Sequence, residues 1–148
     1  LYDTGIQLQH PHAANYLMSG KAPKLTGNSH PNIAPYDLYP TQTTPVFLGV
    51  GNNGQFAKLC ASLGEPELAR DPRFADNSLR VANREALNAA LTRLFADKDG
   101  VAVATELMAA GVPAGAAMSV PEAMNHPVGR AQTAKQSGHR DRNGEVSW

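Results

Sequence analysis

The apolar residues of this chain recur at intervals of three and four in several stretches, and this spacing predicts amphipathic helices. The clearest helix begins near Asn83, and its apolar face is formed by Leu87, Ala90, Leu91, Leu94 and Phe95. Further helices are predicted over residues 53–63 and 101–110. Residues 2–18 predict two short helices separated at Pro11, because proline lacks an amide hydrogen and clashes with the preceding turn.

Short apolar runs between these helices predict strands. Residues 45–51, PVFLGVG, are rich in Val and Phe and predict a buried strand. Residues 113–120 predict a second, brief strand, since Pro113 and the small residues after it do not continue a helix. Residues 64–85 hold two prolines among charged residues and predict short helical turns along a surface. The predicted fold class is therefore α/β, with a few short strands and surrounding helices.

Local polar signals predict where some elements begin and end. Asn52 is followed three residues later by Gln, and Ser119 by Glu, and both pairs are typical of a helix start. The second of these helices should end near Asn125, before a proline. Residues 143–144, Asn-Gly, predict a hairpin turn near the end of the chain.

A turn-rich polar stretch at residues 26–44 leads into the first predicted strand. It is dense in Gly, Pro and Asn, so its shape is set by the backbone and not by an apolar face. Such a loop either presents groups to a ligand or simply makes a long connection between two elements, and the composition leaves both open.

Composition and charge restrict the class of protein. The chain has 148 residues, 42% of them hydrophobic, which suffices for the core of one ordinary domain. Its 13 basic residues balance 13 acidic ones, so nucleic acid and anionic lipid are not expected as partners. No apolar run is long enough to cross a bilayer, and we expect a cytoplasmic protein. The single cysteine, Cys60, falls on an apolar helix face and is expected to be a buried structural thiol.

Several polar residues are candidates for chemistry. Asp3 lies at the start of the first predicted helix, where it is either a helix cap or a nucleophilic or acid/base carboxylate. His10 and His12 lack the spacing that directs two imidazoles at one metal ion, and no metal site is expected. His30, in the polar loop, is a better candidate for contact with a ligand. Arg73, Arg80 and Arg84 suit a phosphate, but a solvated helix face is the simpler interpretation.

Six segments carry a resemblance to a known family. They are, in order, LYDTGIQLQHPHAANYLMSGK, GNSHPNIAPYDLYPT, VGNNGQFAKLC, DPRFADNSLRVANREAL, AAGVPAG and VPEAMNHPVGRA. Together they resemble the class III CoA-transferases, a family that includes formyl-CoA and carnitine CoA-transferases and the alpha-methylacyl-CoA racemases. The resemblance extends from the start of the chain to about Ala134.

The resemblance implies an acyl-CoA:carboxylate CoA-transferase in which Asp3 is the catalytic nucleophile. In the family such an aspartate attacks an acyl-CoA thioester to give a mixed anhydride, and then carries CoA as an aspartyl thioester. In the racemases the matching aspartate instead moves a proton beside the thioester, so a racemase-like enzyme or another CoA-linked isomerase is the alternative activity that the resemblance implies. The resemblance also implies that Gly27, Asn28, Ser29 and His30 form the loop that closes over the acyl group. Asn28, Ser29 and His30 stand where formyl-CoA transferases have glycines.

The resemblance further implies domains, partners and substrates. Residues 1–33 would be the end of the large-domain helices with the loop, residues 34–127 an α+β small domain, and residues 128–148 the start of a return segment. An interlocked homodimer is expected, with an acyl-CoA and a carboxylic acid as substrates and no tightly bound cofactor. Because the chain begins at Leu1 inside a helical pattern, we expect a fragment, inactive alone, of a longer enzyme of acyl-CoA metabolism. The other possibility is a non-catalytic module that mediates subunit contact.

Overall fold

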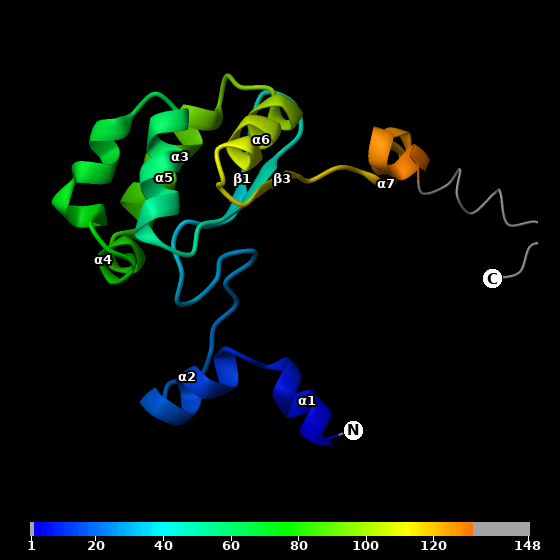
Figure 1. Cartoon of the computed structure of the whole chain (residues 1–148). Coiled ribbons are helices and arrows are strands. Elements are labelled where there is room, and N and C mark those ends of the chain that lie inside the picture. Colours follow the sequence, from blue (N-terminus) through cyan, green and yellow to red (C-terminus); the bar gives the residue numbers. More distant parts are fainter. Residues whose placement is uncertain (1, 132–148) are drawn as a thin grey trace, which may run out of the picture. The chain divides into compact units, whose positions relative to one another are not determined.

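The computed structural model describes residues 2–131, and it divides the chain into two compact units, residues 1–116 and 117–148. Figure 1 shows the helices and strands along the chain. The α-helices of the first unit are α1 (Tyr2–Leu8), α2 (His12–Ser19), α3 (Asn53–Ser62), α4 (Asn77–Ala82), α5 (Arg84–Phe95) and α6 (Gly100–Ala109). Its strands are β1 (Tyr36–Tyr39), β2 (Val46–Gly49) and β3 (Ala114–Ala116), and its 3-10 helices are η1 (Pro66–Arg70) and η2 (Pro72–Phe74). In the second unit, the described residues form α7 (Val120–Asn125).

The strands form one antiparallel sheet in the order β1-β2-β3. Strand β2 confirms the strand predicted over residues 45–51, and β3 is shorter than the predicted run of residues 113–120. Strand β1 was not predicted, because its four residues lie between Pro35 and Pro40 in what reads as loop. The predicted polar loop is therefore shorter than its composition suggested. The hairpin turn predicted at residues 143–144 lies outside the described residues.

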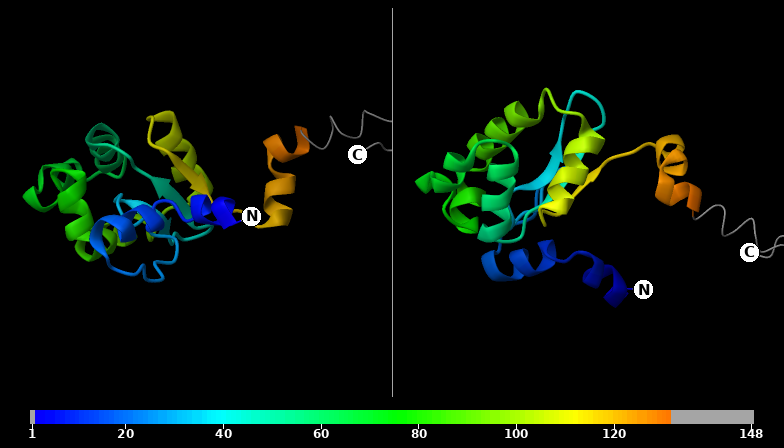
Figure 2. Two further views of the ribbon diagram at one scale, coloured as in Figure 1. Left: turned by 90° about the horizontal axis from the view of Figure 1, so that it is seen from below. Right: turned by 45° about the horizontal axis from the view of Figure 1, so that its top comes forward.

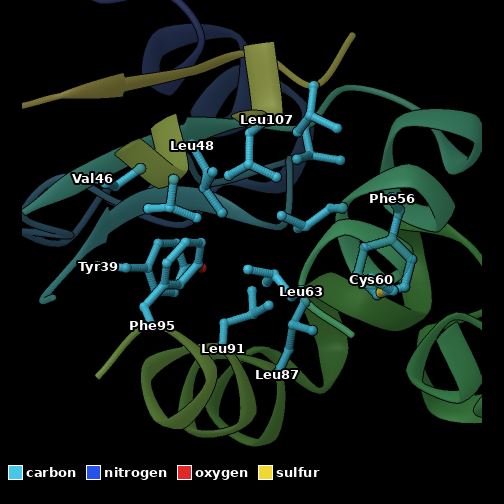
Figure 3. Close-up of a cluster of buried hydrophobic side chains, with 14 of the residues drawn as sticks. Tyr39, Val46, Leu48, Phe56, Cys60, Leu63, Leu87, Leu91, Phe95 and Leu107 are labelled. Carbon is cyan, nitrogen blue, oxygen red and sulfur yellow. The ribbon is translucent and has the colours of Figure 1, made fainter. Parts of the chain in front are cut away.

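One face of the sheet carries the core. Figure 3 shows Tyr39, Val46 and Leu48 of the strands facing the apolar side of α5. The core residues that α3, α5 and α6 add are Phe56, Leu59, Cys60, Leu87, Leu91, Phe95, Val103, Ala104 and Leu107. The rings of Tyr39 and Phe95 stack with their centroids 5.7 Å apart. Burying each large aliphatic side chain contributes about 1.5–3 kcal/mol, so this layer is the main source of stability of the first unit.

The helix starts confirm the predicted caps. The side chain of Asn52 accepts a hydrogen bond from the amide of Gln55 at 2.9 Å. Ser119 and Glu122 form the predicted capping box at the start of α7. Gly20, with φ of 68°, ends α2 in the left-handed conformation that glycine adopts at little cost. Such signals are read correctly from sequence because each involves only neighbours along the chain.

Helix α6 begins against the turn between β1 and β2. The amide of Gly100 donates to the hydroxyl of Thr43 at 2.9 Å, and that hydroxyl in turn donates to the carboxylate of Asp99 at 3.0 Å. A Cβ atom at Gly100 would overlap the carbonyl oxygen of Thr44. The residue before the helix and its first residue therefore fix the end of the hairpin. Figure 2 gives two further views of α3, α5, α6 and the sheet.

Helices α1 and α2 differ from the rest of the first unit in having an open apolar surface. They confirm the two short helices predicted on either side of Pro11. None of the residues of α2 is buried, and Leu17 and Met18 are 82% and 88% exposed. Among the described residues, no helix combines the length and the apolar character needed to cross a membrane.

Candidate functional site

Asp3 lies in the first turn of α1 and is exposed to solvent. Amide hydrogens at the start of a helix have no partner within the helix. Because α1 already includes Tyr2, Asp3 is within the helix and is not its cap residue. The side chain of Asp3 is therefore part of the helix and open to solvent, and its predicted role as a nucleophile stays a prediction.

The predicted loop, Gly27 to His30, is a compact turn. Gly27 has φ of 61°, a conformation that glycine takes readily, and the amide of Ser29 donates to the carbonyl of Thr26 at 3.1 Å. The hydroxyl of Ser29 donates to the carboxylate of Asp37 on β1. Gly27 and Asn28 are exposed, whereas Ser29 and His30 are half-buried. The loop therefore has an open tip and an anchored base.

His30 is held by both its backbone and its ring. Its amide donates to the carbonyl of Tyr36 at 3.1 Å, and the two rings lie 5.1 Å apart between centroids. Nδ1 of His30 accepts a hydrogen bond from the amide of Asn32 at 3.1 Å, which leaves Nε2 to carry the proton of the neutral ring. Burial lowers the pKa of His30, and the positive charge of Arg84 lowers it further. The ring is therefore a neutral hydrogen-bond donor at neutral pH.

Two of the three candidate arginines are not on a solvated face, which corrects the interpretation from sequence. Arg80 is fully buried, and its guanidinium donates to the carbonyls of Ala34 and Phe74 at 2.8 and 3.0 Å. Arg84 is half-buried and donates to the carbonyl of His30 at 2.7 Å. Only Arg73 fits the expectation, as it is exposed and pairs with Asp71 at 2.7 Å. From sequence alone, an arginine is expected on the surface because it is charged. Its five N–H donors can nevertheless bind backbone carbonyls in the interior of a fold.

A pocket of about 760 Å³ borders the exposed tip of the loop. Its lining residues are Leu8, Gln9, His12, Pro23, Lys24, Leu25, Thr26 and Gly27. The pocket thus connects α1 and α2 with the loop. Asp3 is not among its lining residues, so this pocket does not bring Asp3 and the loop together.

A second hollow, of about 420 Å³, lies on the outer side of the sheet. Tyr36 and Phe47, whose rings meet edge to face with centroids 5.1 Å apart, form part of its wall. Sequence reasoning missed Tyr36 and Asp37 as neighbours of the loop, because both lie in the unpredicted strand β1. The alternation of Tyr36 and Leu38 in YDLY is the signal that indicates this strand.

No group of three or more His, Cys, Asp or Glu side chains in the described part of the chain is placed to hold a metal ion. The expectation that coenzyme A acts as a substrate and that no cofactor stays bound remains a prediction.

Comparisons with known proteins give a consistent result. Residues 1–147 match the model of CoA-transferase family III. The chain is 42% identical over 109 residues to the acetyl-CoA:oxalate CoA-transferase of Acetobacter aceti, an alignment that covers 74% of this chain and 28% of that protein. It is 41% identical over 115 residues to the succinate–glutarate CoA-transferase of Agrobacterium fabrum, covering 76% of this chain and 28% of that protein.

The fold agrees with solved structures. A CAIB/BAIF family protein from Brucella suis is similar with a TM-score of 0.74 and 43% identity, over 88% of this chain and 34% of that one. The predicted fold class, a small α/β domain, is thus confirmed. The chain spans little more than a quarter of the length of the first two curated relatives, 28% in each case.

Proposed function

Because residues 1–147 match its model, this chain belongs to CoA-transferase family III, and we propose that it forms part of an enzyme that transfers CoA from an acyl-CoA to a carboxylic acid. The relatives named above act, by their names, on acyl-CoA and carboxylate pairs. The family match is the observation that carries the proposal, and the structure adds an exposed carboxylate and an anchored loop.

Asp3 is the nucleophile in this proposal. One of its carboxylate oxygens attacks the thioester carbonyl, the carbon–sulfur bond breaks, and departure of the CoA thiolate leaves a mixed anhydride of Asp3 and the acyl group. The thiolate then attacks the aspartyl carbonyl of the anhydride, which releases the first carboxylate and leaves an aspartyl-CoA thioester. The acceptor carboxylate attacks that thioester, and the same two steps in reverse give the new acyl-CoA and restore Asp3. No redox step is involved.

The position of Asp3 suits this chemistry. The nucleophile must be reachable by its substrate, and Asp3 lies in the first turn of α1. Its exposure leaves it open to a large substrate such as a CoA thioester. The loop Gly27 to His30 is proposed to cover the acyl group, with its tip exposed and its base fixed on β1 and α5.

The test is to trap the covalent intermediate in the full-length protein. After incubation with acyl-CoA, digestion and mass spectrometry should find CoA on the peptide that contains Asp3, and Asp3→Asn should abolish both this adduct and CoA exchange. Asp97→Asn is the matched control, because Asp97 is an exposed aspartate in the turn after α5. Exchange by Asp3→Asn at a rate close to that of the unaltered enzyme would exclude the nucleophilic role.

The acceptor is proposed to be a small dicarboxylic acid. The relatives named above carry oxalate, succinate and glutarate in their names, and they align with this chain at about 40% identity. Exchange measured with oxalate, succinate and glutarate against acetate and butyrate should favour the diacids. Equal rates with the monoacids would contradict this choice of acceptor and leave the transferase assignment intact.

Two finer expectations also belong to this proposal. We place the full-length enzyme in the cytoplasm, as a homodimer of interlocked subunits, and its mass in solution by light scattering tests the dimer.

The racemase alternative can be separated from transfer by incubating the enzyme with acyl-CoA in D₂O without any acceptor acid. Deuterium at the carbon next to the thioester would then favour the racemase over the transferase.

A further inference from the structure

In the segment from His30 to Ala34, the backbone carbonyl of every second residue accepts a hydrogen bond from a side chain. The donor side chains all belong to α4 or to the first residue of α5. The donor and acceptor pairs are Arg84 with His30, Asn77 with Asn32, and Arg80 with Ala34, at distances of 2.7, 2.8 and 2.8 Å. The segment forms no regular strand or helix, so these side chains take the place of a neighbouring strand in satisfying its carbonyls.

Arg80 and Asn77 are the rigid members of this set. The guanidinium of Arg80 is fully buried, also donates to the side chain of Asn53, and lies 4.6 Å over the ring of Phe56. Asn77 also accepts a hydrogen bond from the amide of Ala34 at 3.1 Å, so its amide group holds the segment from two sides. Both residues fix the end of the segment that adjoins the core.

Arg84 holds the end that adjoins the loop, and its bonding is incomplete. Its Nη2 lies 2.7 Å from the carbonyl oxygen of His30 and 3.4 Å from that of Pro31. Its Nη1 is buried and has no hydrogen-bond partner among the residues that the structure describes. A buried donor without a partner is costly, so stability alone does not explain an arginine at this place.

Three contacts of His30, one of them with Arg84, determine which polar atom its ring presents. With its carbonyl held by Arg84, its amide by Tyr36 and its Nδ1 by the amide of Asn32, the ring has one free polar position, Nε2–H. The charges that lower the pKa of His30 are those of Arg84 on α5, of His10 before α2 and of His12 at the start of α2. Its other titratable neighbours are Tyr36, in ring contact, and Asp37, which binds the adjacent Ser29. The ring is therefore kept as a donor of one hydrogen bond.

We propose that Arg84 is a positioning residue, which holds the loop Gly27 to His30 in the shape that directs Nε2–H of His30 at the acyl oxygen of the substrate. The inference rests on the proposed function, because it takes the loop to cover the acyl group. Arg84 itself touches no substrate in this proposal. It acts on the reaction only through the backbone and the ring of His30.

The test uses the full-length protein and three kinds of variant. Arg84→Gln removes the charge, and Arg84→Lys keeps it on a single donor. Asn77→Asp keeps the acceptor for Ala34 but loses the donor to Asn32, and an aspartate in the first turn of α4 suits the helix. Arg93→Gln, an exposed position on the same helix α5, is the matched control. Melting temperatures confirm that each variant is folded.

Three measurements give the expected results. Amide hydrogen exchange over residues 28–34 should accelerate in Arg84→Gln and Asn77→Asp and stay unchanged in Arg93→Gln. The pKa of His30, followed by NMR, should rise in Arg84→Gln and stay low in Arg84→Lys. The kcat of CoA exchange should fall about tenfold in Arg84→Gln, the loss of about 1.4 kcal/mol of transition-state stabilisation, with part of it restored in Arg84→Lys.

The outcomes separate this inference from the proposed function. If amide hydrogen exchange over residues 28–34 and the pKa of His30 are both unchanged in Arg84→Gln, the positioning role is overturned, whatever the activity. Faster amide hydrogen exchange and a raised pKa with normal kcat would support the hold of Arg84 on the loop and would show that the loop does not cover the acyl group. Faster amide hydrogen exchange, a raised pKa and a lowered kcat would support both the positioning role and the proposed function. If Arg84→Gln does not fold, Asn77→Asp tests the same hold on the segment through amide hydrogen exchange and through the kcat of CoA transfer.

Discussion

At the scale of single residues, the first unit buries two side chains with polar or reactive atoms completely, those of Cys60 and Arg80. Cys60 was expected to be a buried thiol, and it is fully buried in the core beside Phe56 and Leu59. Arg80 was expected on a solvated face, yet it is also fully buried. Apolar neighbours at helical spacing identified the first environment. The second depends on carbonyls 6 and 46 residues away, which no local pattern shows.

The environment of Cys60 predicts an unreactive thiol. Burial raises the pKa of Cys60 to about 11, so the thiolate is scarce in the folded protein at neutral pH. Iodoacetamide at pH 7.5 should leave Cys60 unmodified in the native state and modify it rapidly in urea, as mass spectrometry would show. Because the folded pKa is raised, modification of the native protein should increase only as the pH rises towards 11. Rapid native modification at pH 7.5 would contradict the burial.

The bonding of Arg80 predicts a large loss of stability on a seemingly conservative change. In Arg80, three separate nitrogens each reach a different acceptor, namely the carbonyls of Ala34 and Phe74 and the side chain of Asn53. Arg80→Lys leaves a single nitrogen that cannot reach all three acceptors, and should cost about 2–5 kcal/mol of unfolding free energy. Urea denaturation followed by circular dichroism measures the loss. Arg70→Lys, at an exposed arginine whose partner is Glu67, should change the free energy of unfolding by less than about 0.5 kcal/mol. Similar effects of the two changes would mean that Arg80 is not held as described.

At the scale of elements, prediction succeeded where one element carries its own signal. The helices on either side of Pro11, the helix start at Asn52 and the capping box at Ser119 involve residues within a few positions of one another. Strand β1 failed, because its four residues are stabilised by pairing with β2 and lie in a proline-rich stretch. The candidate loop was located from sequence, but its anchors on β1 and α5 are long-range and could not be.

The start of α6 gives a prediction at this scale. Gly100→Ala places a methyl group against the carbonyl of Thr44, so the hairpin between β1 and β2 must shift, at a cost of about 1–3 kcal/mol. Gly115→Ala on β3 is the control, since a Cβ there meets nothing within 4 Å, and it should be neutral or slightly stabilising. Thermal unfolding by circular dichroism compares the two. Equal melting temperatures would show that the turn yields without cost.

At the scale of the whole molecule, the elements that form the core of the first unit are not the ones that expose large apolar side chains on α2. The core lies between the sheet and helices α3, α5 and α6, whereas α2 buries none of its residues. Large exposed apolar side chains on one segment are typical of a surface that meets another protein surface. The domain limits at residues 33 and 127 predicted from the resemblance remain a prediction.

This separation predicts how the chain of residues 1–148 behaves alone. Replacing Leu17 and Met18 by Glu should leave its melting temperature unchanged, because both side chains are more than four-fifths exposed, and should reduce self-association. Size-exclusion chromatography over a concentration series measures the association. Lys21→Glu, at an exposed position next to α2, controls for the added negative charge. If the double variant and the unaltered chain self-associate equally, the exposed apolar side chains of α2 do not mediate the association.

Helix α2 and the segment from His30 to Ala34 are also joined by one reciprocal contact. The side-chain amides of Asn15 and Asn32 each donate to the other, at 2.9 and 3.0 Å. An aspartate at either position keeps one of these bonds, but aspartates at both positions face each other as like charges, so the two changes are not additive. A chimaera that takes its first helices from one homologue and the segment from His30 to Ala34 from another should therefore inherit these two positions from the same parent.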